Sequence, residues 1–166
     1  MKEKLNITAS IVLYKEDLME LTQTISCFLD IPLTKKLFLI DNTPAKLFEG
    51  KFNQPEIEYI PIGRNIGFGA GHNKILNKIK VLSEHHLILN PDVSFQKSVL
   101  PNLIEKLKSN KRVMLIAPKV LFPNGKHQYS CRRYPEFFEL FIRRVPFLIP
   151  FFKNKVEKGM YKDRDL

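Results

Sequence analysis

Cysteine is scarce in this sequence, whose 166 residues contain only Cys27 and Cys131. The two lie far apart and form no Cys-x-x-Cys pair, which argues against a disulfide scaffold and a zinc site and favours reduced thiols in a cytosolic protein. No apolar run approaches the ~20 residues that span a bilayer. No apolar signal-peptide segment follows Met1 either, so we expect a cytoplasmic protein.

Acidic residues are in short supply toward the C-terminus. The net charge is +10 overall, and residues 111–166 hold 13 Lys and Arg against 5 Asp and Glu, a net +8. This basic third predicts an anionic partner there, whether a membrane surface, a phosphorylated substrate or a nucleic acid. The hydrophobic content of 44% is that of a folded globular chain, long enough for one domain, or for one domain and part of another.

Apolar patterning predicts alternating strands and helices. Strands are expected at residues 7–13, 36–40, 57–62, 86–90 and 113–117, and helices at 16–29, 70–82 and 98–107. This alternation predicts an α/β domain of Rossmann-like layering, with a mainly parallel sheet flanked by helices. After the turn signal Asn124-Gly125 the chain is rich in Arg, Phe and Pro without a clear strand. We therefore predict two regions, 1–124 and an incomplete 125–166.

Polar residues follow three of the predicted strands directly. The apolar run Leu87–Leu89 is typical of a strand buried on both faces, and it stops at Asn90-Pro91-Asp92. Tyr14-Lys15 and Asp41-Asn42 follow two earlier strands. If these strands adjoin, their polar ends converge on the crevice where open α/β sheets bind ligands. A polar-Pro-Asp corner is also an ordinary turn, and from these residues alone both readings stay open.

Two of these polar residues, Asp41 and Asp92, are carboxylates, and both suit the binding of a nucleotide. Asp41 can accept the imide N–H of uracil or thymine in a hydrogen bond of about 1.5–3 kcal/mol; capping the turn at residues 42–44 is the other reading. Asp92 is a hard oxygen ligand, and one carboxylate with diphosphate oxygens and water is a usual way of holding Mg²⁺ or Mn²⁺ on a nucleotide. Such a metal neutralises a diphosphate leaving group.

A glycine-bearing loop spans residues 63–73 (GRNIGFGAGHN). Its four glycines allow positive φ and close backbone approach, and Arg64 offers a planar fork suited to phosphate. The spacing does not match GxGxxG, and the chain has no GK[ST], which excludes a P-loop. Three histidines, His72, His85 and His86, are interpreted as structural, since the adjacent pair on a strand points to opposite faces.

Four segments together resemble family 2 glycosyltransferases, and most closely the rhamnosyltransferase-like branch that builds bacterial surface polysaccharides. They are residues 11–15 (IVLYK), 40–43 (IDNT), 64–73 (RNIGFGAGHN) and 89–93 (LNPDV). Residues 128–135 (QYSCRRYP) also resemble that branch, so the resemblance covers about residues 7–135. It implies a nucleotide-diphospho-sugar transferase fold of the GT-A type. It also implies transfer of a sugar, such as rhamnose, from a nucleoside-diphosphate donor to a saccharide or lipid-linked acceptor.

The resemblance also implies roles for particular residues. Asp41 would contact the base, and Asn90-Pro91-Asp92 stands where the family has Asp-x-Asp, with Asp92 as the ligand of Mn²⁺ or Mg²⁺. The first position departs from the family, which leaves Asn90 as a ribose or hydrogen-bonding contact. The implied nucleotide-binding residues are Tyr14, Asp41, Arg64, Asn65, Gly67 and Asn90.

A second departure concerns the catalytic base. The family has an acidic pair further on, and residues 125–166 contain no Glu-Asp pair. Asp163 and Asp165 lie in a mixed-charge tail, so we expect a donor-binding half that does not transfer sugar alone. The Phe-rich tract at 137–152 is either core for a missing half, which predicts self-association, or an anchor at the inner membrane surface.

Two other functions remain as alternatives. A nucleotidyltransferase would carry a glycine- and basic-rich loop after the first strand, which is absent. A nucleic-acid-binding or membrane-surface module could use the basic third, but its charges are interleaved with bulky aliphatic residues rather than gathered on a polar face, so nucleic acid is not an expected partner.

Overall fold

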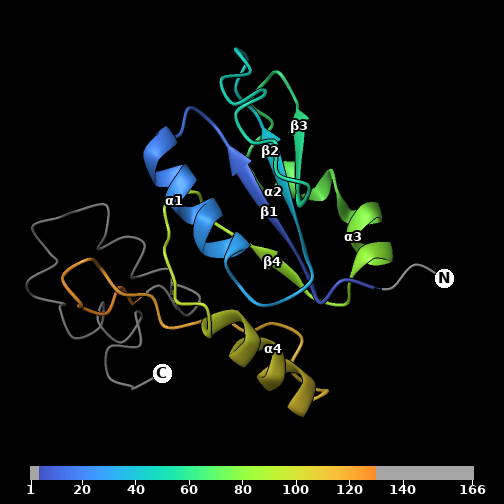
Figure 1. Ribbon diagram of the computed structural model, residues 1–166, viewed down its shortest axis with the longest axis vertical. Helices are drawn as coiled ribbons and strands as arrows, with labels where there is room; N and C mark the ends of the chain where they lie inside the picture. The colour runs from blue at the N-terminus through green and yellow to red at the C-terminus, as the bar shows by residue number, and fades with distance from the viewer. Residues whose placement is uncertain (1–3, 130–166) are drawn as a thin grey trace, which may run out of the picture. The chain divides into compact units, whose positions relative to one another are not determined.

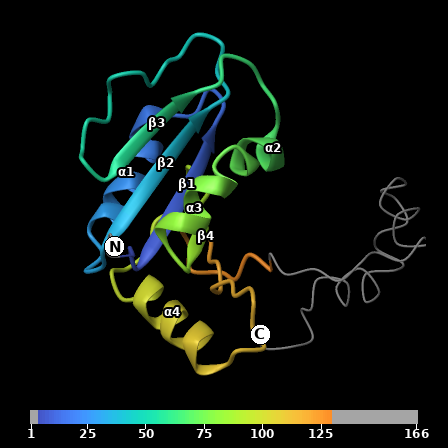
Figure 2. The ribbon, with the colours of Figure 1, turned by 90° about the vertical axis from the view of Figure 1, so that its right-hand side faces the viewer.

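The computed structural model describes residues 4–129. Its elements follow one another as β1 (Ile7–Leu13), α1 (Leu18–Leu29), β2 (Lys35–Asp41), β3 (Ile57–Pro61), α2 (Phe68–Asn73), α3 (Leu76–Leu82), β4 (His86–Ile88) and α4 (Val99–Ser109). The four strands form one parallel sheet in the order β3-β2-β1-β4, with helices on both of its faces (Figures 1 and 2). The predicted α/β layered architecture is confirmed.

Strand β1 lies inside the sheet, and all seven of its residues are buried. Its odd-numbered residues, such as Ile11 and Leu13, share one core cluster with Leu21 and Phe28 of α1. Its even-numbered residue Val12 belongs to a second cluster on the other face, with Phe38, Ile40 and Ile75. This alternation follows from the two-residue period of a strand, and it requires helices on both faces of the sheet. In Figure 2, α1 lies on one side of the sheet and α2 and α3 on the other.

Helix α1 begins where its sequence provides a cap. The carboxylate of Asp17 accepts hydrogen bonds from the backbone N–H groups of Met19 at 2.8 Å and Glu20 at 3.0 Å. These are two of the four N–H groups that a helix start leaves without a partner, and such a cap contributes about 1 kcal/mol. The predicted helix at 16–29 is thus confirmed, with Asp17 just before its first turn.

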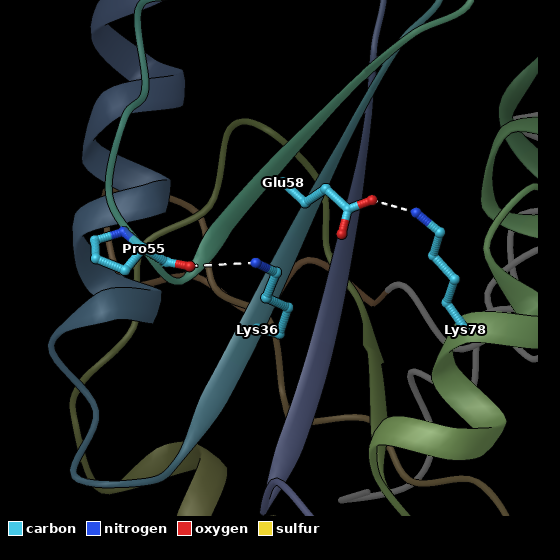
Figure 3. Close-up of polar contacts among 4 residues, drawn as sticks. All are labelled: Lys36, Pro55, Glu58 and Lys78. Carbon is cyan, nitrogen blue, oxygen red and sulfur yellow. Dashed lines mark hydrogen bonds and ion pairs between the residues drawn. The ribbon is translucent and has the colours of Figure 1, made fainter.

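Two polar contacts fasten the β3 side of the sheet (Figure 3). The ammonium of Lys78 on α3 pairs with the carboxylate of Glu58 on β3. Lys36 Nζ of β2 donates to the backbone oxygen of Pro55, just before β3, at 3.2 Å. The Lys78 and Glu58 side chains remain partly exposed, so we expect about 0–1 kcal/mol from this pair.

Three predictions about elements are wrong. The helix expected at 70–82 is two short helices that break at Lys74 and Ile75, and the first begins already at Phe68. The break lets Ile75 enter the core cluster of the α3 face. No strand forms at 113–117, where Met114 and Leu115 are 89% and 86% exposed. This apolar run has no partner strand among residues 4–129, and a strand exists only when it is paired.

The third error concerns β4, since the apolar run Leu87–Leu89 predicts a strand that is buried on both faces. It is the edge strand of the described sheet, and Ile88 is 56% exposed. Leu89, which points to the α1 face, is buried as predicted. Within residues 4–129 no further strand pairs with the free edge of β4, and the exposure of Ile88 shows that the face opposite Leu89 is not fully covered.

The chain divides into two compact units between Ile116 and Ala117. In the described part of the second unit, Phe122 and Lys126 close a tight turn through an N–H···O bond of 2.8 Å, with Gly125 at φ +78°. This confirms the predicted turn at Asn124-Gly125. The boundary expected at residue 124 stays a prediction. The remaining predictions for the C-terminal region lie outside the described residues. They concern the Phe-rich tract at 137–152, Asp163, Asp165 and most of the acceptor-side region 125–166.

Candidate functional site

The carboxyl ends of three strands are level with one another. The register places Leu13 of β1 opposite Asp41 of β2, and Asp41 opposite Pro61 of β3. From β1 the chain builds the sheet in one direction through β2 and β3, and then places β4 on the opposite side of β1. The strand order therefore reverses between β1 and β4, which in open α/β sheets marks the ligand-binding crevice. The condition on which the expected convergence rests is met, because β2 and β4 both lie beside β1.

The exits of β1 and β2 are joined by backbone and side-chain hydrogen bonds. The N–H of Asn42 donates to the oxygen of Leu13 at 2.9 Å, and the N–H of Lys15 donates to Oγ1 of Thr43 at 3.1 Å. Lys15 adopts φ +62°, a left-handed conformation that is uncommon outside glycine. Its ammonium lies 5.4 Å from the ring centroid of Tyr14, which is 42% exposed. An aromatic face and a cation are thus presented together at this edge.

Asp41 lies at the centre of this edge and is fully buried. Its Oδ1 accepts the N–H of Thr43 at 2.8 Å, and its Oδ2 accepts the hydroxyl of Tyr59 at 2.5 Å. Burial, reinforced by the hydrogen bond to Asp41, raises the pKa of Tyr59. The turn-capping contact that the sequence left open is therefore present. The base contact stays a prediction, and it would have to use the remaining lone pairs of a carboxylate that already has two donors.

The glycine loop divides into positions with different roles. Gly63 and Gly67 have φ of +74° and +82°, as their freedom from a side chain allows. Gly71 packs against Val12, because a Cβ at this position would lie 2.6 Å from Val12 Cγ2. A Cβ at Gly69, by contrast, would have no neighbouring atom within 4 Å. The loop therefore serves helix packing and turn geometry as well as any ligand.

Two side chains form hydrogen bonds to the backbone of the glycine loop at Gly67. Asn65 Oδ1 accepts the N–H of Gly67 at 2.9 Å, and Asn42 Nδ2 donates to the oxygen of Gly67 at 3.3 Å. Oδ1 of Asn42 is buried and has no hydrogen-bond partner among the described residues. Arg64 is exposed. The structure thus links Gly67 and Asn65 to the exit of β2.

Asn90 and Asp92 follow β4 with exposed side chains. The ladder continues one residue beyond β4, since the N–H of Leu89 donates to the oxygen of Ser10 at 3.0 Å. Within residues 4–129 the carboxylate of Asp92 has no hydrogen bond or ion pair, and no three His, Cys, Asp or Glu side chains gather into a metal-binding group. One free carboxylate fits a divalent cation that takes its other ligands from diphosphate oxygens and water.

Two histidines that the sequence marked only as structural meet at Ser10. Ser10 Oγ lies 2.7 Å from Nδ1 of His72 on α2 and 2.8 Å from Nε2 of His86 on β4. Burial lowers the pKa of His72, and burial together with the neighbouring His72 lowers the pKa of His86 to about 4. Both rings are therefore neutral at pH 7. Their hydrogen bonds to Ser10 of β1 connect α2 and β4 through this strand.

The directions of the bonds in this network follow from counting protons. Ser83 donates to the backbone oxygen of His85 at 2.5 Å, and Oγ1 of Thr8 donates to the same oxygen at 3.4 Å. Nδ1 of His86 then donates to Oγ1 of Thr8 at 2.9 Å, and Nε2 of the same ring accepts from the hydroxyl of Ser10. This assignment leaves Nε2 of His72 as a buried lone pair without a partner in the described chain.

Sequence reasoning missed two residues that shape this edge, Ser10 and Thr24. Ser10 joins the two histidines, and Thr24 of α1 bonds the loop that carries Asp92. Ser10 is a polar residue in a fully buried strand, and Thr24 is a polar residue on the buried face of α1; a polar side chain at such a position is the signal that could have revealed each of them.

A scan against models of known protein families gives no match, and a search of curated proteins gives none. In the part of the chain that the structure describes, no helix is both long enough and apolar enough to cross a membrane.

Proposed function

We propose that this chain binds the donor of a metal-dependent glycosyltransferase, one that takes a sugar such as rhamnose from a nucleoside diphosphate. The four motifs that resemble the rhamnosyltransferase-like branch of family 2 support this proposal, and so does the parallel sheet, which is compatible with a fold of the GT-A type. The acceptor in the proposal is a saccharide or a lipid-linked saccharide.

One observation carries the proposal. Asp92 is exposed beside the reversal of strand order between β1 and β4, and within residues 4–129 its carboxylate has no hydrogen bond or ion pair. A carboxylate that stabilised the fold would be expected to accept hydrogen bonds or pair with a cation, as Asp41 and Asp17 do. An unpaired carboxylate at the carboxyl edge of a parallel sheet is instead available to a ligand.

The remaining residues supply binding and orientation. Tyr14 offers an exposed ring face to a base, while Arg64 can reach a phosphate and Asn90 a ribose hydroxyl. A divalent cation held at Asp92 would supply Lewis-acid stabilisation of the diphosphate leaving group. Asp41 fixes the turn after β2 and so determines where the base would meet the edge of the sheet.

Calorimetry with uridine and thymidine diphosphate tests this proposal. The chain should bind at least one of them more tightly with Mn²⁺ than with a chelator. Asp92→Ala should remove the metal effect and leave the metal-free affinity unchanged. Glu84→Ala provides a matched control, because Glu84 is an exposed carboxylate near the amino end of the same strand. Equal affinity of the unaltered chain with Mn²⁺ and with chelator would refute the proposal.

A further inference from the structure

The hydroxyl of Thr24 is bonded to a loop far away in the sequence. Thr24 is 1% exposed and lies on the face of α1 that also buries Leu21, Ile25 and Phe28. Its Oγ1 donates toward the backbone oxygens of Pro91 and Val93, both at 2.8 Å, and accepts the N–H of Val93 at 3.1 Å. The hydroxyl has one proton, which the two oxygens share, so Thr24 holds the backbone on either side of Asp92 through one shared donor bond and one accepted bond.

This is not the usual behaviour of a hydroxyl on a helix. Thr22 and Ser26 of the same helix donate to the carbonyl four residues earlier, Thr22 to Leu18 at 2.7 Å and Ser26 to Thr22 at 2.9 Å. Both are exposed, and such back-bonding is the ordinary choice for Ser and Thr in a helix. Thr24 instead bonds partners 67 and 69 residues away. Its hydroxyl therefore serves the loop after β4 rather than the helix.

The loop is consequently held at two points with Asp92 between them. On the side of β4, the N–H of Leu89 donates to Ser10 at 3.0 Å. On the other side, Thr24 fixes the backbone of Pro91 and Val93. The backbone around Asp92 is restrained while its carboxylate stays exposed. Such an arrangement is what a ligating side chain needs, since groups that orient a ligand typically change metal affinity 10–100-fold.

We propose that Thr24 is the positioning residue for the cation-binding carboxylate of Asp92. The inference rests on the proposed function, since it presumes that Asp92 binds a divalent cation together with a nucleoside diphosphate. Thr24 itself touches neither the metal nor the nucleotide in this proposal; it holds the loop whose side chain does.

The test compares three variants of the full chain by calorimetry with the diphosphate, with Mn²⁺ and with chelator. Thr24→Val keeps the branched shape but removes the hydroxyl, Thr24→Ser keeps the hydroxyl, and Thr22→Val removes a hydroxyl that bonds only its own helix. Thr24→Val should lower the Mn²⁺ enhancement of binding about tenfold while the metal-free affinity is unchanged. Thr24→Ser and Thr22→Val should retain the enhancement of the unaltered chain.

Amide hydrogen exchange at Val93 monitors the same bond without any ligand, and it should accelerate in Thr24→Val and not in Thr22→Val. If Thr24→Val fails to fold, Thr24→Ala replaces it in both measurements. Full Mn²⁺ enhancement in a variant whose Val93 amide exchanges faster would overturn the inference, as would equal losses with and without metal. Absence of any Mn²⁺ effect in the unaltered chain would refute the proposed function, and the role of Thr24 would fall with it.

Discussion

Replacing Gly71 by alanine would insert a methyl group between α2 and β1. The new Cβ would lie 2.6 Å from Val12 Cγ2 and 2.9 Å from Val12 Cγ1, closer than real Cβ contacts come. Val12 cannot yield easily, because a β-branched side chain has few χ1 choices and this one is 8% exposed in a core cluster with Phe38 and Ile40. Overpacking of this kind costs about 1–3 kcal/mol.

The helix propensity of alanine offsets part of this cost. Alanine is favoured over glycine inside a helix by about 1 kcal/mol, so the net loss of unfolding free energy should be about 0–2 kcal/mol. Gly69, two residues earlier in α2, is a matched control, since its Cβ would meet nothing within 4 Å. Gly69→Ala should therefore stabilise the chain by about 0.4–1 kcal/mol.

Urea unfolding followed by circular dichroism measures both changes. The double variant Gly71→Ala/Val12→Ala should lose less stability than the sum of its single variants, because the methyl groups that collide are gone. If Gly71→Ala were as stable as Gly69→Ala, the close approach of α2 to β1 would be refuted. Additive losses in the double variant would show that the loss has another cause than the contact with Val12.

Three further predictions concern the histidine network, the cap of α1 and the packing of the sheet. The pKa of His86 is about 4 when folded against an ordinary 6.5, so the unfolded chain binds more protons and stability should fall as the pH drops from 6.5 toward 4. After allowance for partial exposure, the loss of unfolding free energy at pH 5 should be about 1–2 kcal/mol. Urea unfolding of His86→Gln should therefore depend less on pH than that of the unaltered chain, and an equal pH dependence of the two would contradict this prediction. Asp17→Ala should lower the free energy of unfolding by about 1 kcal/mol, and no loss would show that the cap is dispensable. Leu89→Ala should cost about 2–5 kcal/mol and Ile88→Thr less than about 0.5 kcal/mol, whereas equal losses would mean that Ile88 is covered.

The amino-acid sequence by itself determined the elements whose cause is local. The apolar run at 7–13 predicts β1, and the helical apolar period within 16–29 predicts α1. Asn124-Gly125 predicts its turn in the same way. These features depend on residues a few positions apart, such as the apolar residues that recur along one face of α1, and such patterns can be seen in the printed order of the chain. The polar residues at the ends of β1, β2 and β4 could be recognised for the same reason.

Only the tertiary structure decided which segments are paired and what each side chain meets. The run at 113–117 has the composition of a strand but no partner among the described residues, and Ile88 is exposed because β4 lies at the described edge. Gly71 meets Val12, and Thr24 meets the loop around Asp92, across long stretches of sequence. Contacts of this kind arise from the order and register of the strands. A local pattern does not contain that order, because the same apolar strand can pair with any neighbour that buries it.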